Sequence, residues 1–209
     1  MSKPEIILIG AGGHARACID VIEQQDYFQI AGLVDRPEQR NTRCLGYSVI
    51  GADTDLSELI QHYSHALITV GQIETAEHRI RLYQQAAQHR FHLPAIISSF
   101  AYVSRHANIG EGTVVMHGAI VNAAARVGKN CIVNNQALVE HDVNIDDHCH
   151  ISTGAVLNGA VSIGAGSFVG SGSVIKEGVT IGKGCLVGMG LTVRQNLSDD
   201  TYFTGHDKI

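Results

Sequence analysis

The sequence predicts an α/β domain with a small, Rossmann-like parallel sheet, followed by a parallel β-helix built of hexapeptide repeats. From residue 103 to residue 193, every sixth residue is Val, Ile or Leu without a break, which is typical of a parallel β-helix. Before residue 100, short apolar runs alternate with segments of helical periodicity, which indicates parallel strands joined by helices. We therefore expect a first domain over residues 1–98 and a second over residues 99–209.

The first half begins as a strand, a glycine turn and a helix. The apolar run 6–9 precedes the turn, and Cys18, Ile19, Val21 and Ile22 follow it at helical spacing. Further strands are expected at 29–34, 47–50, 66–70 and 93–97, and helices at 55–63 and 75–89. This alternation is typical of a parallel sheet flanked by helices.

The turn itself, Gly10-Ala11-Gly12-Gly13-His14-Ala15, matches the dinucleotide-binding fingerprint with Ala at the third glycine position. Asp35 ends the second strand, where an acid can bind a ribose hydroxyl. A nucleotide other than a nicotinamide cofactor is favoured, because about ninety residues cannot supply both halves of a full dinucleotide fold. A structural turn that binds no ligand is the alternative.

In the second half, each hexad supplies one strand and one turn. Its aliphatic residue should point inward and stack on the residues eighteen positions away, about 4.8 Å along the axis. The residue two positions earlier is usually small, and Gly often follows the aliphatic residue, where we expect it to permit a tight corner. Three of the five cysteines, Cys131, Cys149 and Cys185, occupy the small position. They are expected to be buried thiols rather than disulfides or metal ligands.

Composition excludes several classes of function. The chain has 209 residues and a formal net charge of -5, and it contains no cluster of Lys and Arg, so neither nucleic acid nor an anionic membrane surface is indicated as a partner. No apolar run has transmembrane length, and the first residues do not form a signal peptide. A cytoplasmic location is therefore expected.

The densest polar run of the repeat lies between residues 134 and 150. His141 follows a rung residue by two positions, at a corner that should face outward between the small residues Ala123 and Gly159. Asp142 could orient the ring and strengthen it as a base, provided that the corner turns both side chains together. His148 and His150 could instead chelate a metal, but no third ligand is evident, so no metal is predicted.

Both halves together resemble the family of bacterial sugar acyltransferases that includes nucleotide-aminosugar N-acetyltransferases and sialic acid O-acetyltransferases. The likeness covers nearly the whole chain. It depends on the Gly10–His14 turn, the unbroken hexads, and Val139-Glu140-His141-Asp142 followed by His150-Ile151-Ser152. The resemblance implies a left-handed β-helix, a homotrimer, and acetyl-CoA as the donor, bound between subunits.

The resemblance also implies roles for individual residues. His141 would be the general base, Asp142 would orient it, and His150 would contact the acetyl end of the thioester. Two further cofactor positions would be Ser171 and Met189, which are eighteen residues apart. The positions matching the sugar-nucleotide site are Gly12, Gly13, His14, Asp35, Arg36, Gly71 and Asn134. The C-terminal sequence Thr204-Gly205-His206-Asp207-Lys208-Ile209 departs from the Gly-Val-Pro-Ala ending common in the family, which puts cofactor contacts near the C-terminus in doubt.

Three functions follow as alternatives. The favoured one is acetyl-CoA-dependent N-acetylation of the 4-amino group of a nucleotide-linked 4-amino-4,6-dideoxy sugar, because a nucleotide-type turn precedes the acyltransferase half. The second is O-acetylation of a sialic or related nonulosonic acid, and the third is a non-enzymatic scaffold. Transfer should be direct, without a covalent enzyme intermediate, because CoA is a good leaving group and the nearby Cys149 should point inward.

Overall fold

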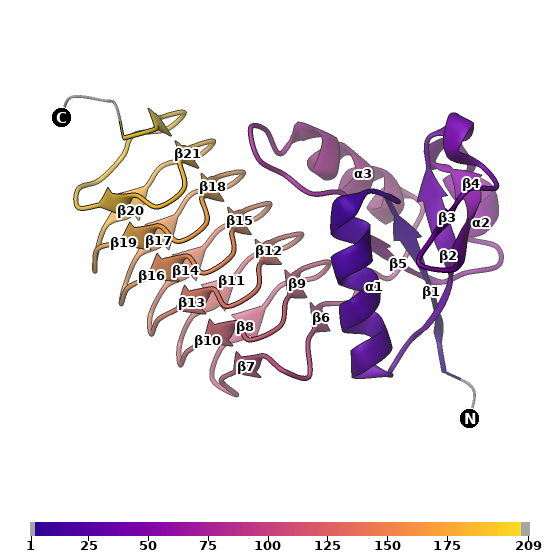
Figure 1. Cartoon of the computed structure of the whole chain (residues 1–209), viewed down its shortest axis with the longest axis horizontal. Helices are drawn as coiled ribbons and strands as arrows, with labels where there is room; N and C mark the ends of the chain where they lie inside the picture. The colour runs from indigo at the N-terminus through magenta and orange to yellow at the C-terminus, as the bar shows by residue number, and fades with distance from the viewer. Residues whose placement is uncertain (1–2, 206–209) are drawn as a thin grey trace.

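The computed structural model describes residues 3–205, and its first half is a sheet with helices on both faces (Figure 1). The strand order is β3-β4-β2-β1-β5. The strands are β1 (Glu5–Ile9), β2 (Gln29–Asp35), β3 (Arg43–Cys44), β4 (Tyr47–Ala52) and β5 (His65–Ile68). All pair in parallel except β3, which is antiparallel to β4. The carboxyl ends of β1, β2 and β5 therefore meet at one edge of the sheet, where parallel α/β sheets bind ligands.

The helices divide between the two faces of this sheet. They are α1 (Gly13–Gln25), α2 (Leu56–Leu59) and α3 (Glu77–Gln88), with 3-10 turns at η1 (Pro37–Gln39) and η2 (Asp53–Asp55). Helix α1 shares a core with Leu8 of β1 and with Val114 and Ile132 of the second half, so it is packed between the sheet and the β-helix. Helices α2 and α3 pack on the opposite face, against Ile7 and Ile9.

The helix that follows β4 and the hairpin that precedes it differ from the sequence prediction. The helix expected at 55–63 ends at Leu59, because the N–H groups of Gln61 and His62 bond carbonyl oxygens only three residues back and form turns. The hairpin strand β3 was not predicted. Its turn consists of Leu45 and Gly46, both with positive φ (48° and 88°), and Leu-Gly lacks the Asn-Gly or Asp-Gly signal of such turns.

The second half is a β-helix of two-residue strands arranged in three parallel sheets (Figure 1). The first sheet contains β7 (Tyr102–Val103), β10 (Ile120–Val121), β13 (Leu138–Val139), β16 (Val156–Leu157), β19 (Val174–Ile175) and β22 (Thr192–Val193). The second contains β8 (Asn108–Ile109), β11 (Arg126–Val127), β14 (Asn144–Ile145), β17 (Ser162–Ile163) and β20 (Thr180–Ile181). The third contains β6 (Ile96–Ile97), β9 (Val114–Val115), β12 (Ile132–Val133), β15 (His150–Ile151), β18 (Phe168–Val169), β21 (Leu186–Val187) and β23 (Tyr202–Phe203).

The hexad register is the predicted one. Val121 pairs with Val103 on one side and with Val139 on the other, each eighteen residues away. The aliphatic rungs from Val115 onward are buried, and Val103 and Ile109 at the open end are partly buried. All three cysteines of the repeat are buried and free, as predicted.

The glycines that directly follow rung residues have a different role from the expected one. Residues with positive φ also recur every sixth position. They lie two residues after the glycine position of each hexad, as at Gln136, Asp142 and His148. At Gly170, by contrast, an added Cβ would lie 2.5 Å from the backbone of Gly188 in the next coil. These glycines therefore permit close approach of consecutive coils rather than a left-handed backbone.

The segment expected as a last strand of the first half instead opens the β-helix. Strand β6 pairs with β9, so Ile96 and Ile97 belong to the third sheet of the coil. We therefore propose that the two domains meet just before residue 96 rather than at 98, and residues 206–209 of the predicted second domain lie outside the described part. Within residues 3–205, no helix combines the length and apolarity needed to cross a bilayer.

Candidate functional site

His141 and Asp142 share the corner that follows β13. Asp142 has φ of 60°, and this left-handed backbone turns its side chain to the same side as that of His141. The Nδ1 atom of His141 lies 2.9 Å from Oδ2 of Asp142, and both side chains are about two-thirds exposed, at 65% and 63%. The corner thus brings together the two groups that a straight strand would separate.

The hydrogen bond fixes the form of the imidazole. The ionised carboxylate of Asp142 can only accept, so Nδ1 of His141 carries the hydrogen and Nε2 carries the free lone pair. Glu140 supports the same corner: its Oε2 accepts hydrogen bonds from the His141 backbone N–H (3.3 Å) and from Nδ2 of Asn122 (3.0 Å). The arrangement presents Nε2 of His141 to solvent, with the ring held by Asp142 and the backbone of the corner held by Glu140.

The small neighbours predicted for His141 have distinct effects. Gly159 lies under the ring, because an added Cβ there would be 2.7 Å from Cε1 and 2.9 Å from Nε2 of His141. Ala123, on the opposite coil, is exposed, and its carbonyl oxygen accepts the Asp142 N–H at 3.2 Å. The imidazole therefore fills the space above Gly159.

His150 lies in a different environment. It is buried, and Nδ1 contacts the carbonyl oxygen of Gln72 at 2.7 Å while Nε2 contacts Nδ2 of Asn134 at 3.1 Å. A carbonyl only accepts, so Nδ1 is the protonated nitrogen and Nε2 accepts from Asn134. Phe168 packs edge-on against the ring, with centroids 5.1 Å apart. Burial lowers the pKa of His150 to about 4, so the ring is neutral at pH 7.

His150 pairs with Ile132 on one side and with Phe168 on the other, in an otherwise apolar column. Its hydrogen bonds give a physical reason for a polar ring in this column, but they occupy both ring nitrogens. His150 thereby connects Asn134 on the β-helix to Gln72, which follows Gly71, one of the predicted sugar-nucleotide residues. Gln72 is itself buried, and its Nε2 donates to the carbonyl oxygen of Gly166 at 3.1 Å. Two of the predicted site residues, Asn134 and His150, are thus in direct contact.

Arg79 joins the two halves nearby. Its guanidinium is buried and donates to the carbonyl oxygens of Ile68 (2.7 Å) and Val70 (2.8 Å) from Nη1, and to that of Asn130 (3.1 Å) from Nε. Burial lowers the pKa of Arg79 to about 10, which leaves it charged at neutral pH. His14, with Nε2 3.5 Å from Sγ of Cys18, has its pKa lowered to about 3 by burial, with the positive charge of Arg79 acting in the same direction.

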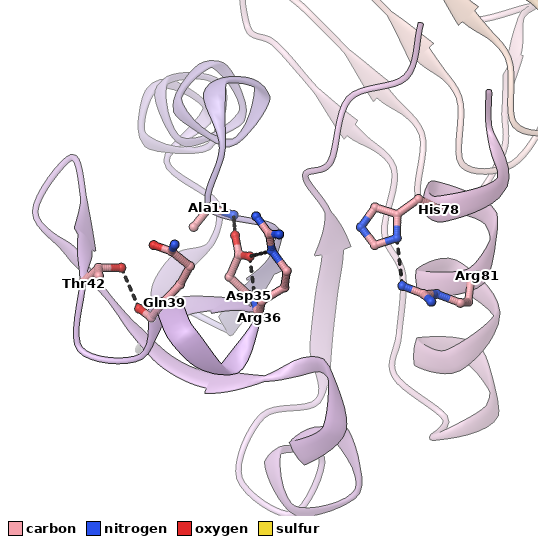
Figure 2. Close-up of polar contacts among 7 residues, drawn as sticks. All are labelled: Ala11, Asp35, Arg36, Gln39, Thr42, His78 and Arg81. Carbon is pink, nitrogen blue, oxygen red and sulfur yellow. Dashed lines mark hydrogen bonds and ion pairs between the residues drawn. The ribbon is translucent and has the colours of Figure 1, made fainter. Parts of the chain in front are cut away.

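Six of the predicted sugar-nucleotide residues, all except Asn134, line one pocket at the carboxyl ends of β1, β2 and β5. Its volume is about 460 Å³, and its lining includes Gly12, Gly13, His14, Asp35, Arg36, Gly71 and His78. Oδ2 of Asp35 accepts the Ala11 N–H at 2.6 Å, and Oδ1 accepts the Arg36 N–H at 2.7 Å (Figure 2). Asp35 therefore fixes the glycine turn, and its carboxylate is already held by backbone donors.

Ser171 and Met189 lie on adjacent coils, as their spacing predicts. The Gly190 N–H donates to the carbonyl oxygen of Ser171 at 2.8 Å. Met189 is 81% exposed, and Oγ of Ser171 is 2.8 Å from Oγ of Ser152. The column thus presents an exposed thioether beside a pair of hydroxyls.

Other features of the site were not predicted from sequence. Gln72, Arg79 and His78 carry no local motif, and their contacts depend on how α3 and the loop before it pack. Within the described residues, no group of three or more His, Cys, Asp or Glu side chains could hold a metal ion.

An α/β domain with a nucleotide-type pocket, joined to a hexapeptide β-helix with a His–Asp corner, defines a hexapeptide-repeat acyltransferase with an N-terminal α/β domain. Family models agree: the PglD N-terminal domain matches residues 5–85, and the hexapeptide repeat of succinyl-transferase matches residues 160–195. The comparison with curated proteins gave no match.

Several solved structures are similar over almost the whole chain. A mutant of perosamine N-acetyltransferase from Caulobacter crescentus, in complex with CoA and GDP-perosamine, is 34% identical with a TM-score of 0.88, covering 95% of this chain and 92% of that one. The acetyltransferase domain of PglB from Neisseria gonorrhoeae FA1090, in complex with acetyl coenzyme A, is 31% identical with a TM-score of 0.88, covering 95% of each chain. WeeI from Acinetobacter baumannii AYE, at 24% identity and a TM-score of 0.81 over 94% of each chain, shares the fold.

The chain belongs to the family of bacterial nucleotide-aminosugar acetyltransferases. It is an acetyltransferase rather than a scaffold, and the predicted fold class, an α/β domain followed by a left-handed β-helix, is confirmed. The relatives bind CoA or acetyl-CoA, in agreement with the predicted acetyl donor.

Proposed function

We propose that the protein transfers the acetyl group of acetyl-CoA to the 4-amino group of a nucleotide-linked 4-amino-4,6-dideoxy sugar, with His141 as general base. The observation that carries the proposal is the exposed His141–Asp142 pair, whose free Nε2 lone pair is available to an incoming amine. The nucleotide-type pocket at the β1, β2 and β5 ends supports a nucleotide-linked acceptor.

The relatives support the same choice of acceptor. Mutants of perosamine N-acetyltransferase that replace one histidine were solved with CoA and GDP-perosamine, and PerB from Caulobacter crescentus was solved with the same two ligands. N-acetylation by these relatives favours an amine acceptor over the hydroxyl of a sialic acid. O-acetylation is therefore the second candidate.

The proposed reaction needs no covalent enzyme intermediate. The neutral amine attacks the thioester carbonyl, and Nε2 of His141 accepts the amine proton as the C–N bond forms. Collapse of the tetrahedral intermediate breaks the C–S bond, and the proton passes to the departing CoA thiolate. Asp142 holds the imidazole in the required tautomer and stabilises the imidazolium. Cys149 takes no part, because it is buried in the coil.

We further propose that His150 acts as a positioning residue for the acetyl end of the donor, that Asn134 beside it binds the sugar-nucleotide substrate, and that Ser171 and Met189 contact the long chain of the donor. Ser171 and Met189 are exposed on consecutive coils, as a ligand lying along the axis requires. The engaged ring nitrogens of His150 favour a supporting role, with Asn134 offering its remaining amide hydrogen.

A homotrimer with sites between subunits is part of the proposal. The sheet that precedes His141 presents an outward column of Tyr102, Ile120, Leu138 and Val156, of which Tyr102 is 59% exposed and Ile120 is 39% exposed in the single chain. Association through this face would bury apolar surface and enclose the exposed His141 corner. Light scattering coupled to gel filtration should give three times the chain mass.

The test is an assay of CoA release with a panel of nucleotide 4-amino-4,6-dideoxy sugars and, separately, with free sialic acid. We expect turnover with at least one nucleotide aminosugar and none with sialic acid. Turnover with sialic acid alone would replace the first candidate by the second.

A further inference from the structure

The nucleotide pocket is bordered by a residue of α3 that the sequence did not point to. His78 lines this pocket together with Gly12, Gly13 and Arg36. It also lines a smaller neighbouring cavity with Asp35 and Asp53. His78 comes from a helix distant in sequence from the glycine turn, so the pocket has a second wall.

Arg81 sets the orientation of the His78 ring. Nη2 of Arg81 lies 3.0 Å from Nδ1 of His78. A guanidinium only donates, so Nδ1 must be the acceptor, and the ring hydrogen is on Nε2. Figure 2 shows this second nitrogen directed away from Arg81, toward the side where Asp35 and Arg36 lie. The pair therefore presents a fixed N–H donor to the pocket.

The opposite wall is also suited to an anion. Helix α1 begins at Gly13 with no acidic residue in its first turn and no side-chain cap, and an added Cβ on Gly12 or Gly13 would meet no atom within 4 Å. The side chain of Arg36 is 78% exposed, and its Nε lies 3.9 Å from Oδ1 of Asp35, whose carboxylate also accepts hydrogen bonds from two backbone N–H groups. Hydrogen-bond donors thus face the pocket from both walls, and the charge of Arg36 lies beside the Asp35 carboxylate.

We propose that His78, held by Arg81, is a further substrate-binding residue that donates Nε2–H to a phosphate oxygen of the nucleoside diphosphate portion of the substrate. This inference rests on the proposed function, since it assumes a nucleotide-linked acceptor. Arg81 acts as a positioning residue, because it holds the ring and fixes the tautomer. Arg36 and the amino end of α1 bind the diphosphate from the opposite side.

The experiment measures dissociation constants of GDP and UDP by calorimetry on the full-length protein, for wild type and for His78→Ala, His78→Gln, Arg81→Ala and Gln88→Ala. We expect His78→Ala to weaken binding about tenfold, as loss of a hydrogen bond to a charged group does. Arg81→Ala should weaken it by a smaller factor, and His78→Gln, which keeps an N–H donor, should retain part of the affinity. Gln88→Ala, at an exposed position at the far end of the same helix, should match wild type.

Kinetics separate the possible results. The KM for the sugar nucleotide should rise in His78→Ala, while the KM for acetyl-CoA and the melting temperature stay at wild-type values. Wild-type affinity in His78→Ala would overturn this inference and leave the proposed function standing. A loss confined to one of the two nucleotides would place His78 on the base and overturn the phosphate assignment. Absence of nucleotide binding by wild type would contradict both proposals.

Discussion

The imidazole of His141 lies directly over Gly159 of the next coil, and a methyl group at that position would come within 2.7 Å of its Cε1. The backbone of Gly159 is not in the left-handed region, so alanine would be tolerated by the main chain. Only the histidine ring would have to move. Gly159 thus determines where the proposed base can sit.

Gly159→Ala should lower kcat about tenfold or more, because displacing a positioned base by a fraction of an ångström is costly to catalysis. The exposed ring can shift without disturbing the core, so the melting temperature should change little. Steady-state rates and calorimetric titration with acetyl-CoA would measure the two effects. Unchanged kcat in a correctly folded variant would show that the ring position above Gly159 is irrelevant.

His141 and Asp142 should act as one unit. Asp142→Asn removes the charge that orients the ring, and we expect a loss of roughly tenfold to a hundredfold in kcat/KM. In the His141→Asn background, the same change should have almost no further effect, because residues that function together are strongly non-additive. A double-mutant cycle on kcat/KM tests this. Fully additive losses would mean that Asp142 acts independently of the base.

Buried histidines should make stability depend on pH. The folded-state pKa of His150 is about 4, below the value of about 6.5 in the unfolded chain, so protons bind the unfolded state more tightly. The stabilisation is complete above pH 6.5 and is lost as the pH falls toward 4. His150 alone should cost about 2 kcal/mol of unfolding free energy between pH 7 and pH 5. The partly buried His14 acts with the same sign.

Denaturant titrations at several pH values would measure this dependence. His150→Gln should reduce the slope by about one proton, whereas the exposed His106→Gln should not. An unchanged slope in His150→Gln would refute the assignment of a buried neutral ring.

Arg79 should be a main stabilising contact between the two halves. Arg79→Met would leave the carbonyl oxygens of Ile68, Val70 and Asn130 without their donor, and we expect a loss of roughly 3 kcal/mol or more. Arg81→Met, on the exposed face of the same helix, should cost less than about 0.5 kcal/mol. Thermal unfolding of both variants provides the comparison, and equal losses would be inconsistent with a structural role for the buried guanidinium.

The sequence predicted most of the β-helix because each rung depends on a short local pattern repeated along the chain. Val121, Val139 and Leu157 each satisfy the same rule, so the stacking follows from the period alone. The features that were missed depend on contacts distant in sequence. The ring of His150 could be recognised as unusual in its column, but its partner Gln72 is 78 residues away. His78 and Arg79 likewise acquire their contacts only when α3 packs.

The role of His141 is decided by the rate of CoA release with acetyl-CoA and a nucleotide 4-amino-4,6-dideoxy sugar, compared between wild type and His141→Asn. We expect kcat to fall about a hundredfold or more, the typical contribution of a general base, with acetyl-CoA affinity unchanged. Equal turnover by the two proteins would contradict the assignment of His141 as the base.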